Sequence, residues 1–545
     1  MQLTQISNRL ISAVNKKYRY IFLALSGLLT GLMLVFTKIG ILEWITMIPV
    51  GVVLLVRTAD RSVKLRSLYF DGLIFFYAYY LVCYHWFAYL YPLEFIEGMT
   101  KGAALAVVIL AWFGLSLLQT LMGGCVFVFA GILFRCRLCE RFALLRPFVA
   151  AALWAVFEWS QTIGWWGVPW GRLPIGQSKY LVGLQTASYL GSYFVTFLIV
   201  AVNFLLAYAL ICHTKWKRGV ILAASLLVFQ YGAGTLIWFT TDIEDGKAIK
   251  VACIQGNISS SDKWSDDSEI KTTEVYTRLV AKAAEEGAEL VVLPETAFPY
   301  DFDSNEYAYF NRTFCDISEH YGIYILVGAY TREGEKDSLN SLICYTPEGE
   351  RLDTAYSKRH LVPFGEYVPL RPLIETLVPP LAELVLSSDD IDAGEGANVI
   401  ETGEIAIGGL ICFDSIYEEL TYDSVRNGAE LICLATNDSW FSDSAALYMH
   451  NAQAQIRAIE SGRYVTRAAN TGISTVITPR GEVISMLDPL VEGNVYATVY
   501  ARSADTVCVH IGNTFVWILF ASLIGVFADG LVNKLKTSKK NYKKA

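Results

Sequence analysis

The stretch IAIGGLICFDSIY, residues 405–417, is an apolar run with two glycines that ends at Cys412 and passes into a polar segment. Such a run predicts a buried strand that presents Cys412 at its end. A thiol reacts as the thiolate, which a nearby cation or the amide dipoles at a helix start favour. Because a lone cysteine in an apolar run is more often a small structural hydrophobe, residues elsewhere must decide its role.

Two further motifs hold ionisable residues in similar positions. Glu295 closes the apolar run ELVVLPETAFP (289–299), which predicts another strand, and Lys358 lies in YSKRHLVPFGEYVP (356–369), which its Gly and Pro residues mark as a loop. A Glu, a Lys and a Cys on separate turns are the parts of an activated-thiol site for acyl transfer. We therefore take Glu295, Lys358 and Cys412 as the candidate catalytic residues.

Hydropathy and charge divide the chain into a membrane part and a polar part. The 545 residues are 54% hydrophobic with a mean hydropathy of +0.39, which excludes a wholly soluble enzyme. Residues 242–505 hold 44 of the 52 acidic and 19 of the 44 basic residues, a net charge of −25, while the remainder carries +17. An acidic domain is thus set into a membrane protein with basic flanks, and we expect no nucleic-acid partner.

Eight apolar stretches approach or exceed the roughly 20 residues that one membrane crossing needs. They are residues 20–37, 39–56, 69–90, 102–134, 148–167, 181–211, 219–241 and 507–528. The first follows three basic residues like a signal peptide, but no small-residue cleavage site follows, so we expect a retained helix. The predicted domains are a bundle of seven spans (1–241), a polar domain (242–505), and an eighth span with a basic tail (506–545).

Basic residues fall in alternate loops, at residues 16–19, 57–66, 135–146 and 215–218 and in the C-terminal tail. By the positive-inside rule, both termini are cytoplasmic and the acidic domain faces outward, which in a diderm bacterium is the periplasm. Three ionisable residues lie within the apolar stretches. We expect Asp71 and His85, near helix ends, to reach the interface, and Glu158, nearer mid-span, to pack inside the bundle with a polar partner.

The acidic domain alternates apolar strands with amphipathic helices, beginning with IKVACIQGNI (249–258), SEIKTTEVYTRLVAKAAEEGA (268–288) and AELVVLPETAF (288–298). This alternation predicts an α/β domain whose sheet is buried on both faces. Cys136 and Cys139 form one CxxC pair without a second pair or histidines at metal spacing. We therefore predict no metal site and no disulfide framework.

Four motifs in this order, LPETAFP, YSKRHLVPFGEYVP, LICFDSIY and TNDSWF, resemble the carbon-nitrogen hydrolase (nitrilase) superfamily. The resemblance implies an α-β-β-α sandwich and maps the Glu-Lys-Cys triad of the superfamily onto Glu295, Lys358 and Cys412. With seven spans before this domain and one after it, the whole chain resembles the apolipoprotein N-acyltransferase family of bacterial inner-membrane enzymes. One departure is Phe413-Asp414 after the nucleophile, where that family usually has Tyr-Glu, which leaves the roles of these two side chains open.

The resemblance implies a ping-pong reaction without a cofactor. Glu295 is expected to take the proton from Cys412, which attacks an ester carbonyl of a phospholipid acyl donor while Lys358 and a backbone N–H, that of Phe413, stabilise the oxyanion. The resulting thioester passes its acyl chain to the α-amino group of the diacylglyceryl-modified cysteine of an apolipoprotein. Glu366 is expected to support Lys358, and the candidate substrate contacts are Trp264, Phe413 and Trp440. Since the expected base is a Glu, His360 and His450 are interpreted as structural.

Two other functions remain open on the sequence. A membrane-tethered amidase or nitrilase would use the same triad and pass the thioester to water, but it would not need eight spans or the Trp-rich loop GWWGVPWGRLPIG (164–176). That loop is typical either of interfacial anchoring or of a lipid-facing lip. A transporter with an appended sensory domain is the third reading, and the scarcity of charged residues and of paired broken helices in the spans argues against it.

Overall fold

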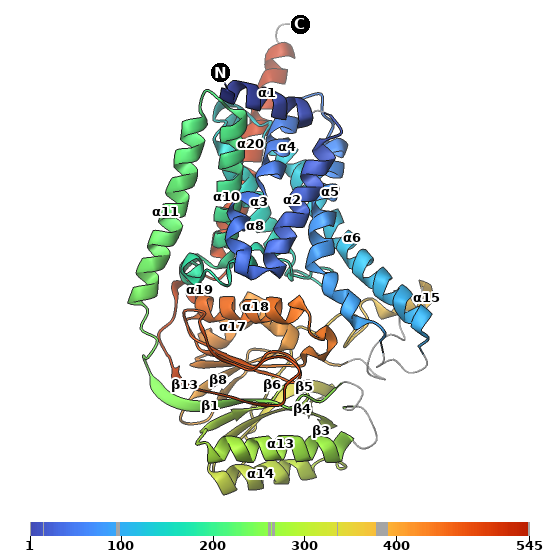
Figure 1. The fold of residues 1–545 in the computed structure, drawn as a ribbon, viewed down its shortest axis with the longest axis vertical. Coiled ribbons are helices and arrows are strands. Elements are labelled where there is room, and N and C mark those ends of the chain that lie inside the picture. The colour runs from blue at the N-terminus through green and yellow to red at the C-terminus, as the bar shows by residue number, and fades with distance from the viewer. Residues whose placement is uncertain are drawn as a thin grey trace. The chain divides into compact units, whose positions relative to one another are not determined.

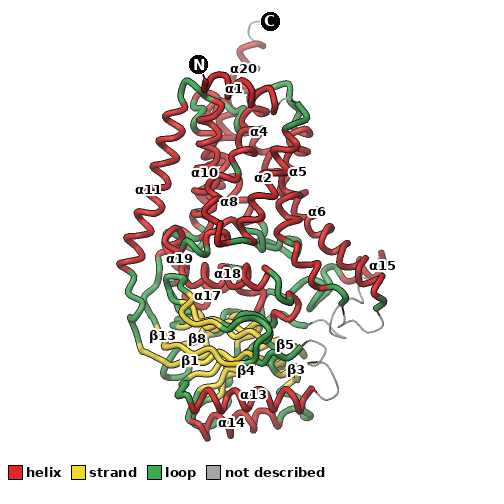
Figure 2. The backbone as a smooth tube through the Cα atoms, in the orientation of Figure 1, coloured by secondary structure: helices red, strands yellow, loops and turns green. Residues whose placement is uncertain are grey.

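The computed structural model describes residues 2–14, 16–93, 99–259, 263, 268–334, 336–377 and 391–542. The chain divides into two compact units, one of Met1–His85, Ile109–Phe239 and Ile511–Ala545, the other of Trp86–Val108 and Thr240–His510. The first unit is helical, and the second holds the strands (Figure 1, Figure 2). Each is described by itself.

The helical unit contains long apolar helices and short connecting turns. Its described helices are α1 (Gln2–Val14), α2 (Arg19–Val35), α3 (Glu43–Thr46), α4 (Ile48–Ala59), α5 (Leu65–Cys83), α6 (Lys101–Leu133, which begins in the second unit), α7 (Arg137–Arg141), α8 (Leu145–Ser160), α9 (Ala187–Leu190), α10 (Ser192–Ile211), α11 (Trp216–Thr240, which ends in the second unit) and α20 (Thr514–Tyr542). The 3₁₀ turns η1 (Thr37–Leu42), η3 (Leu173–Gln177) and η4 (Leu181–Leu184) link them. Helices α2 and α5 pack through glycine, since a Cβ at Gly27 would lie 2.2 Å from the Phe75 carbonyl oxygen.

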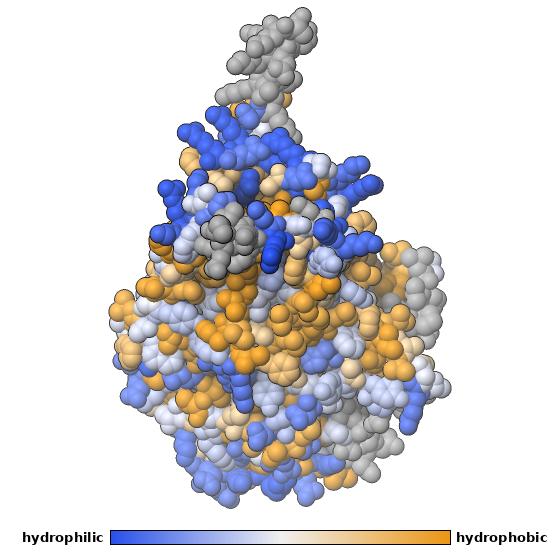
Figure 3. All heavy atoms as spheres, turned by 45° about the horizontal axis from the view of Figure 1, so that its top comes forward, coloured by the Kyte–Doolittle hydropathy of each residue, from blue (hydrophilic) through white to orange (hydrophobic). Residues whose placement is uncertain are grey.

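Each of the eight predicted spans contains a helix, but not all the helices are long enough to cross a membrane. Among the described residues, five runs meet that requirement: Thr37–Ala59, Lys101–Leu133, Ser192–Ile211, Trp216–Thr240 and Thr514–Asn533. The bent pair Asn8–Val14 and Arg19–Val35 would make a sixth. Exposed apolar side chains on the helices of this unit fit a membrane environment (Figure 3). The number of eight spans stays a prediction.

Glycine and proline explain why several helices are shorter than the apolar stretches. Helix α8 ends at Ser160, before a loop in which Gly164 has a φ of +73° and Pro169 follows. In the sixth stretch, Gly191 has a φ of +76° between α9 and α10, so only the last part of 181–211 is one long helix. A positive φ is unfavourable for residues other than glycine and interrupts the helix there.

Two buried carboxylates of the helical unit, Glu158 and Asp71, have polar partners. Glu158 lies inside the unit, as expected, and accepts hydrogen bonds from the Leu173 N–H at 3.0 Å and the Thr196 hydroxyl at 2.5 Å. The expectation for Asp71 was wrong: its side chain is buried and forms ion pairs with Arg19 and Arg57, each at 3.0 Å. Those partners lie on α2 and α4. Because they neutralise the Asp71 carboxylate inside the unit, the side chain does not need to reach water, as it would on an isolated apolar helix.

The second unit contains two sheets. One has the strand order β13-β1-β2-β4-β5-β6, with β3 beside β4, and the other the order β12-β11-β10-β9-β8-β7. The strands of the first sheet are β1 (Lys247–Gln255), β2 (Leu290–Val292), β3 (Phe298–Asp301), β4 (Tyr324–Glu333), β5 (Lys336–Tyr345), β6 (Tyr356–Ser357) and β13 (Gly493–Ala501). Those of the second are β7 (Val399–Glu401), β8 (Ala406–Ile411), β9 (Leu431–Thr436), β10 (Val465–Ala469), β11 (Thr475–Ile477) and β12 (Val483–Met486).

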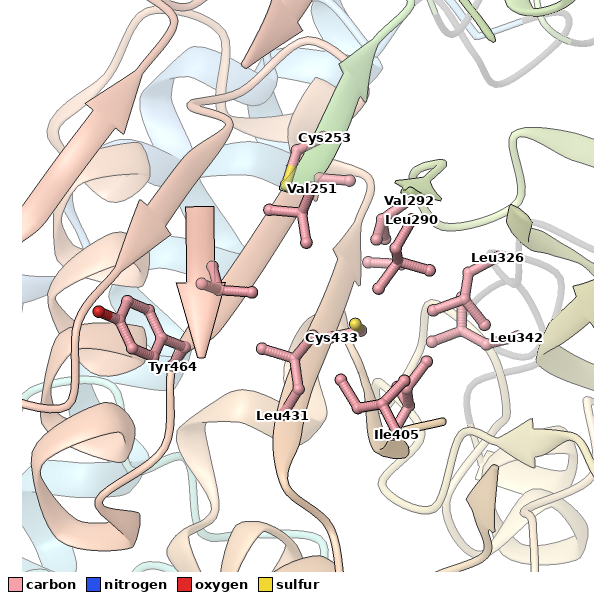
Figure 4. Packing of buried hydrophobic residues seen from close by; sticks show 14 of the residues in the cluster. Val251, Cys253, Leu290, Val292, Leu326, Leu342, Ile405, Leu431, Cys433 and Tyr464 are labelled. Atoms are coloured by element: carbon pink, nitrogen blue, oxygen red, sulfur yellow. The ribbon is translucent and has the colours of Figure 1, made fainter. Parts of the chain in front are cut away.

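Helices cover the outer faces of the two sheets (Figure 1). Helices α13 (Ser268–Glu285) and α14 (Tyr309–Tyr321) lie on the first sheet, and α17 (Glu418–Arg426) and α18 (Ala445–Ser461) on the second. One apolar core packs between the sheets, with Val251, Leu290, Leu326, Leu431 and Cys433 among its members (Figure 4). A second core packs between the first sheet and its helices. The strands are therefore buried on both faces, which explains their continuous apolar sequences.

Parallel pairing places candidate site residues shortly after the carboxyl ends of strands in both sheets. Strands β8, β9 and β10 run parallel, as do β1, β2 and β4, so their carboxyl ends lie at common edges. The residues that follow β8 and β9 include Cys412 and Asp438, and Glu295 follows β2. The segment Trp86–Val108, which the sequence analysis placed with the spans, groups with this unit, and the Trp86 ring meets the Phe441 ring edge-on at 4.9 Å.

Candidate active site

Glu295 lies on a tight turn after β2. Its Oε1 accepts hydrogen bonds from Lys358 Nζ at 2.9 Å and Asn340 Nδ2 at 2.8 Å, and its Oε2 accepts one from the Asn437 N–H at 2.8 Å. The turn lies against Gly328 of β4, where a Cβ would come within 2.3 Å of the Pro294 carbonyl oxygen. Three donors and a close backbone contact thus hold the carboxylate in one orientation.

Lys358 follows the short strand β6 and is held between two carboxylates. Besides Glu295, its ammonium donates to Glu366 Oε1 at 2.8 Å, and Glu366 Oε2 accepts the Val362 N–H at 2.8 Å. The Lys358 side chain is 2% exposed, so both ion pairs are shielded from water. Glu366, eight residues further along a loop, therefore lies where it can fix the position of the lysine.

Cys412 is the first residue after β8 and opens the 3₁₀ turn η5 (Cys412–Ile416). Its φ is +48°, which is unfavourable for a residue with a Cβ, and its side chain is half-buried. The two glycines of the strand admit close neighbours, since a Cβ at Gly409 would lie 2.5 Å from the Tyr356 ring and one at Gly408 2.9 Å from the Ala429 Cβ. The strand therefore ends in a strained turn that presents the thiol.

Asp414, whose role the sequence left open, fixes this turn. Its Oδ2 accepts the Ile411 N–H at 3.1 Å and the Tyr356 hydroxyl at 2.9 Å, and its Oδ1 accepts the His360 N–H at 2.8 Å. The side chain is fully buried. Burial raises the pKa of the Asp414 carboxyl to about 6.

The charges of the triad suit a general base beside a neutral thiol. Burial alone would raise the pKa of Glu295, but Lys358 and the hydrogen bonds from Asn437 and Asn340 hold it below its ordinary value. Burial alone would lower the pKa of Lys358, yet Glu295 and Glu366 raise it well above the usual range. Burial also raises the pKa of Cys412, an effect that Glu295 increases and Lys358 opposes. At neutral pH these shifts give a carboxylate, an ammonium and a protonated thiol.

Sequence reasoning missed several residues that touch the triad. Asn340 is in the middle of β5 and carries no local signal, whereas Asn437 lies in the TNDSWF motif. Lys263 was also missed: it is buried, and its Nζ donates to the Thr296 hydroxyl at 2.6 Å and the Glu295 carbonyl oxygen at 3.3 Å. Burial lowers the pKa of Lys263 to about 7. It braces the Glu295 turn, in which Thr296 has a φ of +42°.

The predicted substrate contacts are placed only in part. Phe413 is half-buried and meets the Tyr417 ring edge-on at 5.4 Å. Trp440 is partly exposed in the 3₁₀ turn η6 (Asp438–Phe441), and Trp264 lies outside the described residues. His360 stacks on Tyr417 at 3.9 Å, and burial lowers its pKa to about 4, so it is neutral. In the part of the chain that the structure describes, no group of three His, Cys, Asp or Glu residues could hold a metal ion.

The second unit and its Glu-Lys-Cys site define a carbon-nitrogen hydrolase domain, and the Carbon-nitrogen hydrolase family model matches residues 250–506. The model named Apolipoprotein N-acyltransferase N-terminal domain matches residues 26–205. The resemblance drawn from the motifs is confirmed, and the chain belongs to the apolipoprotein N-acyltransferase family, whose members are acyltransferases. The family and the apolar helices indicate a membrane protein.

Three relatives illustrate the match. The apolipoprotein N-acyltransferase of Gloeobacter violaceus is 30% identical over 444 residues, which cover 81% of this chain and 80% of the relative. That of Geobacter metallireducens is 32% identical over 69% of this chain and 72% of the relative, and that of Nostoc sp. 28% identical over 88% and 93%. Among solved structures, an amidase from Nesterenkonia sp. aligns at 18% identity with a TM-score of 0.37, covering 48% of this chain and 94% of the amidase.

Proposed function

We propose that this protein transfers a fatty acyl chain from a phospholipid, through a thioester on Cys412, to the α-amino group of the N-terminal diacylglyceryl-cysteine of apolipoproteins, the last step of bacterial lipoprotein maturation. The observation that carries the proposal is the Lys358 ammonium held at 2.9 Å from Glu295 and 2.8 Å from Glu366 in a chain of this family. Such a lysine leaves Glu295 charged and able to act as a base, and it supplies a fixed positive charge for an oxyanion.

In the first half-reaction, Glu295 takes the proton of the Cys412 thiol as the sulfur attacks the ester carbonyl of the donor. The charge passes to the carbonyl oxygen, where Lys358 and the Phe413 N–H would stabilise it. Collapse of the tetrahedral intermediate breaks the ester C–O bond, and the leaving alkoxide recovers the proton from Glu295. The products are a lysophospholipid and the Cys412 thioester.

In the second half-reaction, the free α-amino group of the acceptor attacks the thioester while Glu295 accepts a proton from the nitrogen. The C–S bond breaks, the sulfur takes the proton back, and an N-acylated lipoprotein leaves. A thioester is more activated towards an amine than the starting ester, so the difficult transfer is divided into two easier steps. No cofactor enters either step.

The proposal assigns roles to the remaining site residues and places the domains. Glu366 holds Lys358, and Phe413, Trp440 and Trp264 contact the lipid substrates. Residues 242–505 form the catalytic domain on the periplasmic side of the inner membrane, 1–241 a bundle of seven spans, and 506–545 an eighth span with a cytoplasmic tail. Basic residues in alternate loops support this orientation.

A membrane-tethered amidase or nitrilase is the alternative, because the same triad can pass its acyl group to water, and the catalytic unit matches the carbon-nitrogen hydrolase model. The two functions differ in the fate of the thioester. An N-acyltransferase must protect the thioester from water until the amine arrives, whereas a hydrolase must not.

The intact mass of purified protein incubated with phospholipid alone tests the proposal. We expect a gain of one fatty-acyl mass that is lost when a diacylated lipopeptide is added, with the lipopeptide becoming triacylated. Cys412→Ala should form no adduct, and Cys315→Ala, which removes a half-buried cysteine of α14, should behave as the unmodified chain. An adduct that decays equally fast without the lipopeptide would favour the hydrolase, and absence of both adduct and transfer would refute the proposal.

A further inference from the structure

The carbonyl oxygen of Cys412 is held by side chains from outside its own strand. Nε2 of His450, on α18, lies 3.2 Å from this oxygen and 2.9 Å from the Ser415 hydroxyl. The Ser415 hydroxyl in turn donates to the same carbonyl oxygen at 2.8 Å. The His450 side chain is 1% exposed, so water does not compete for these contacts.

The other ring nitrogen of His450, Nδ1, contacts a buried network of charged side chains. Nδ1 of His450 lies 3.0 Å from Asp438 Oδ1, which also accepts the Thr436 hydroxyl at 2.9 Å. Asp438 Oδ2 accepts Arg467 Nη2 at 2.5 Å, and Arg467 Nη1 donates to the Ile473 carbonyl oxygen. The network thus links η6, α18 and β10 behind the nucleophile.

This network is more than packing. Burying an Asp, an Arg and a His is unfavourable compared with apolar residues of similar volume, which would fill the same space. The neighbouring backbone is fitted to it, since a Cβ at Gly472 would lie 2.2 Å from Asp438 Oδ2. One member of the network, His450, contacts the carbonyl oxygen of Cys412.

The backbone at Cys412 needs such support. A residue with a Cβ at a φ of +48° keeps that conformation only when its surroundings determine it. On one side, Asp414 accepts hydrogen bonds from the amides of Ile411 and His360. On the other, the carbonyl of Cys412 faces Ser415 and His450. Without the contact from His450, the peptide bond after Cys412 is less restrained, and a rotation of this peptide would change the direction of the thiol.

The charges of the network also bear on the thiol. Burial would raise the pKa of Asp438, but Arg467 and His450 hold it far below its usual range, so the side chain is a carboxylate. Its negative charge disfavours a thiolate on Cys412. Arg467 and His450 therefore keep Asp438 ionised, and its charge helps to keep the Cys412 thiol protonated before reaction.

We propose that His450, held by Asp438 and Arg467, is a positioning residue that fixes the Cys412 carbonyl and thereby directs the thiol for acylation. The proposal deepens the function proposed above and rests on it only in taking Cys412 as the nucleophile. It replaces the expectation that His450 is merely structural.

Two substitutions at one position separate positioning from packing. His450→Gln keeps an N–H donor near the place of Nε2, whereas His450→Leu keeps only the volume. The matched control is Gln455→Leu, one and a half turns further along α18, because Gln455 is equally buried and donates to the Gly481 carbonyl oxygen at 2.7 Å, away from the nucleophile. Melting temperature in detergent gives the folded fraction of each variant.

The readouts are the rate of alkylation of Cys412 by iodoacetamide, followed on the peptide that contains it with Cys412→Ala as blank, and the rate of acyl-enzyme formation from phospholipid. We expect His450→Leu to lower both rates about tenfold to a hundredfold, the scale of a misplacement near 1 Å, and His450→Gln to stay within about threefold. Gln455→Leu should keep both rates per folded molecule.

Equal loss in His450→Gln and His450→Leu, or equal loss in Gln455→Leu, would overturn the positioning role. Failure of the proposed function has a different signature. In that case the unmodified chain forms no acyl-enzyme with phospholipid. The rate of Cys412 alkylation can still be compared between the variants, and it tests the role of His450 independently.

Discussion

Replacing Asp414 by Asn should change how the stability of the carbon-nitrogen hydrolase domain depends on pH. Burial raises the pKa of the carboxyl from 3.8 to about 6, because the charged form loses its hydration. An acid whose pKa is raised on folding contributes stability that is present below its unfolded pKa and is lost as the pH rises through about 6. The shift of about two units corresponds to about 3 kcal/mol.

Asn has nearly the same shape and does not titrate, so the change with pH should disappear in Asp414→Asn. At about 2 °C per kcal/mol for a domain of this size, the melting temperature of the unmodified protein relative to the variant should fall by about 5 °C between pH 4 and pH 7. Tryptophan fluorescence in detergent measures both proteins at each pH. Asp443→Asn, at an exposed position, is the control and should give no such difference. A difference that is constant with pH would refute the argument that burial controls Asp414.

Gly328→Ala would place a Cβ 2.3 Å from the Pro294 carbonyl oxygen, so the turn that carries Glu295 must shift, and we expect kcat to fall about a hundredfold with KM nearly unchanged in steady-state transfer assays. Glu366→Gln removes one of the two carboxylate charges that pair with the Lys358 ammonium, and it should slow acyl-enzyme formation about tenfold or more in single-turnover mass measurements. Unchanged rates would mean that Glu366 is only a loop carboxylate. Because the pKa of Glu295 is lowered, the proposed base stays ionised to a pH below its ordinary pKa of 4.5, and the acid limb of the acylation rate should lie below that pH; a limb near pH 6 would contradict this state of the base.

The motifs were enough to propose the catalytic residues because each lies at the end of an apolar strand or in a Gly- and Pro-rich loop. Glu295, Lys358 and Cys412 are such residues, and Glu366 lies only eight positions after Lys358. Asn340 could not be found in this way, since its contact with Glu295 spans 45 residues and depends on how β5 lies beside the turn. His450 was interpreted as structural because a Glu base leaves no role for a histidine, and its contact with the Cys412 carbonyl oxygen, across 38 residues, is not visible in any local pattern.

In the helical unit, too, local sequence patterns did not reveal contacts between distant residues. Apolar runs correctly located its helices, but hydropathy does not register where a backbone turns, so the ends of α8 and the start of α10 were misplaced. Asp71 was expected to reach the interface because a single helix shows no partner for it. Arg19 and Arg57, from two other helices, supply that partner.

The arrangement of charges explains why so polar a site can be buried. Glu295 and Glu366 share one ammonium, so the cluster carries a net charge of about −1 before reaction. In the proposed mechanism, when Glu295 takes the thiol proton, that charge moves to the oxygen of the attacked carbonyl, beside the same lysine. Net charge is conserved within the cluster, and no ion has to be desolvated or released as the barrier is crossed. A thiol that stays protonated until a carbonyl is present is also less exposed to oxidation and alkylation, which would be useful to an enzyme that waits for two substrates in turn, as in the proposed function. On this argument, Lys358→Met should abolish acylation even at a pH where Cys412 is ionised, because the loss lies in the oxyanion and not in the thiol. Rescue of that variant by raising the pH would show that the lysine serves only to tune the nucleophile.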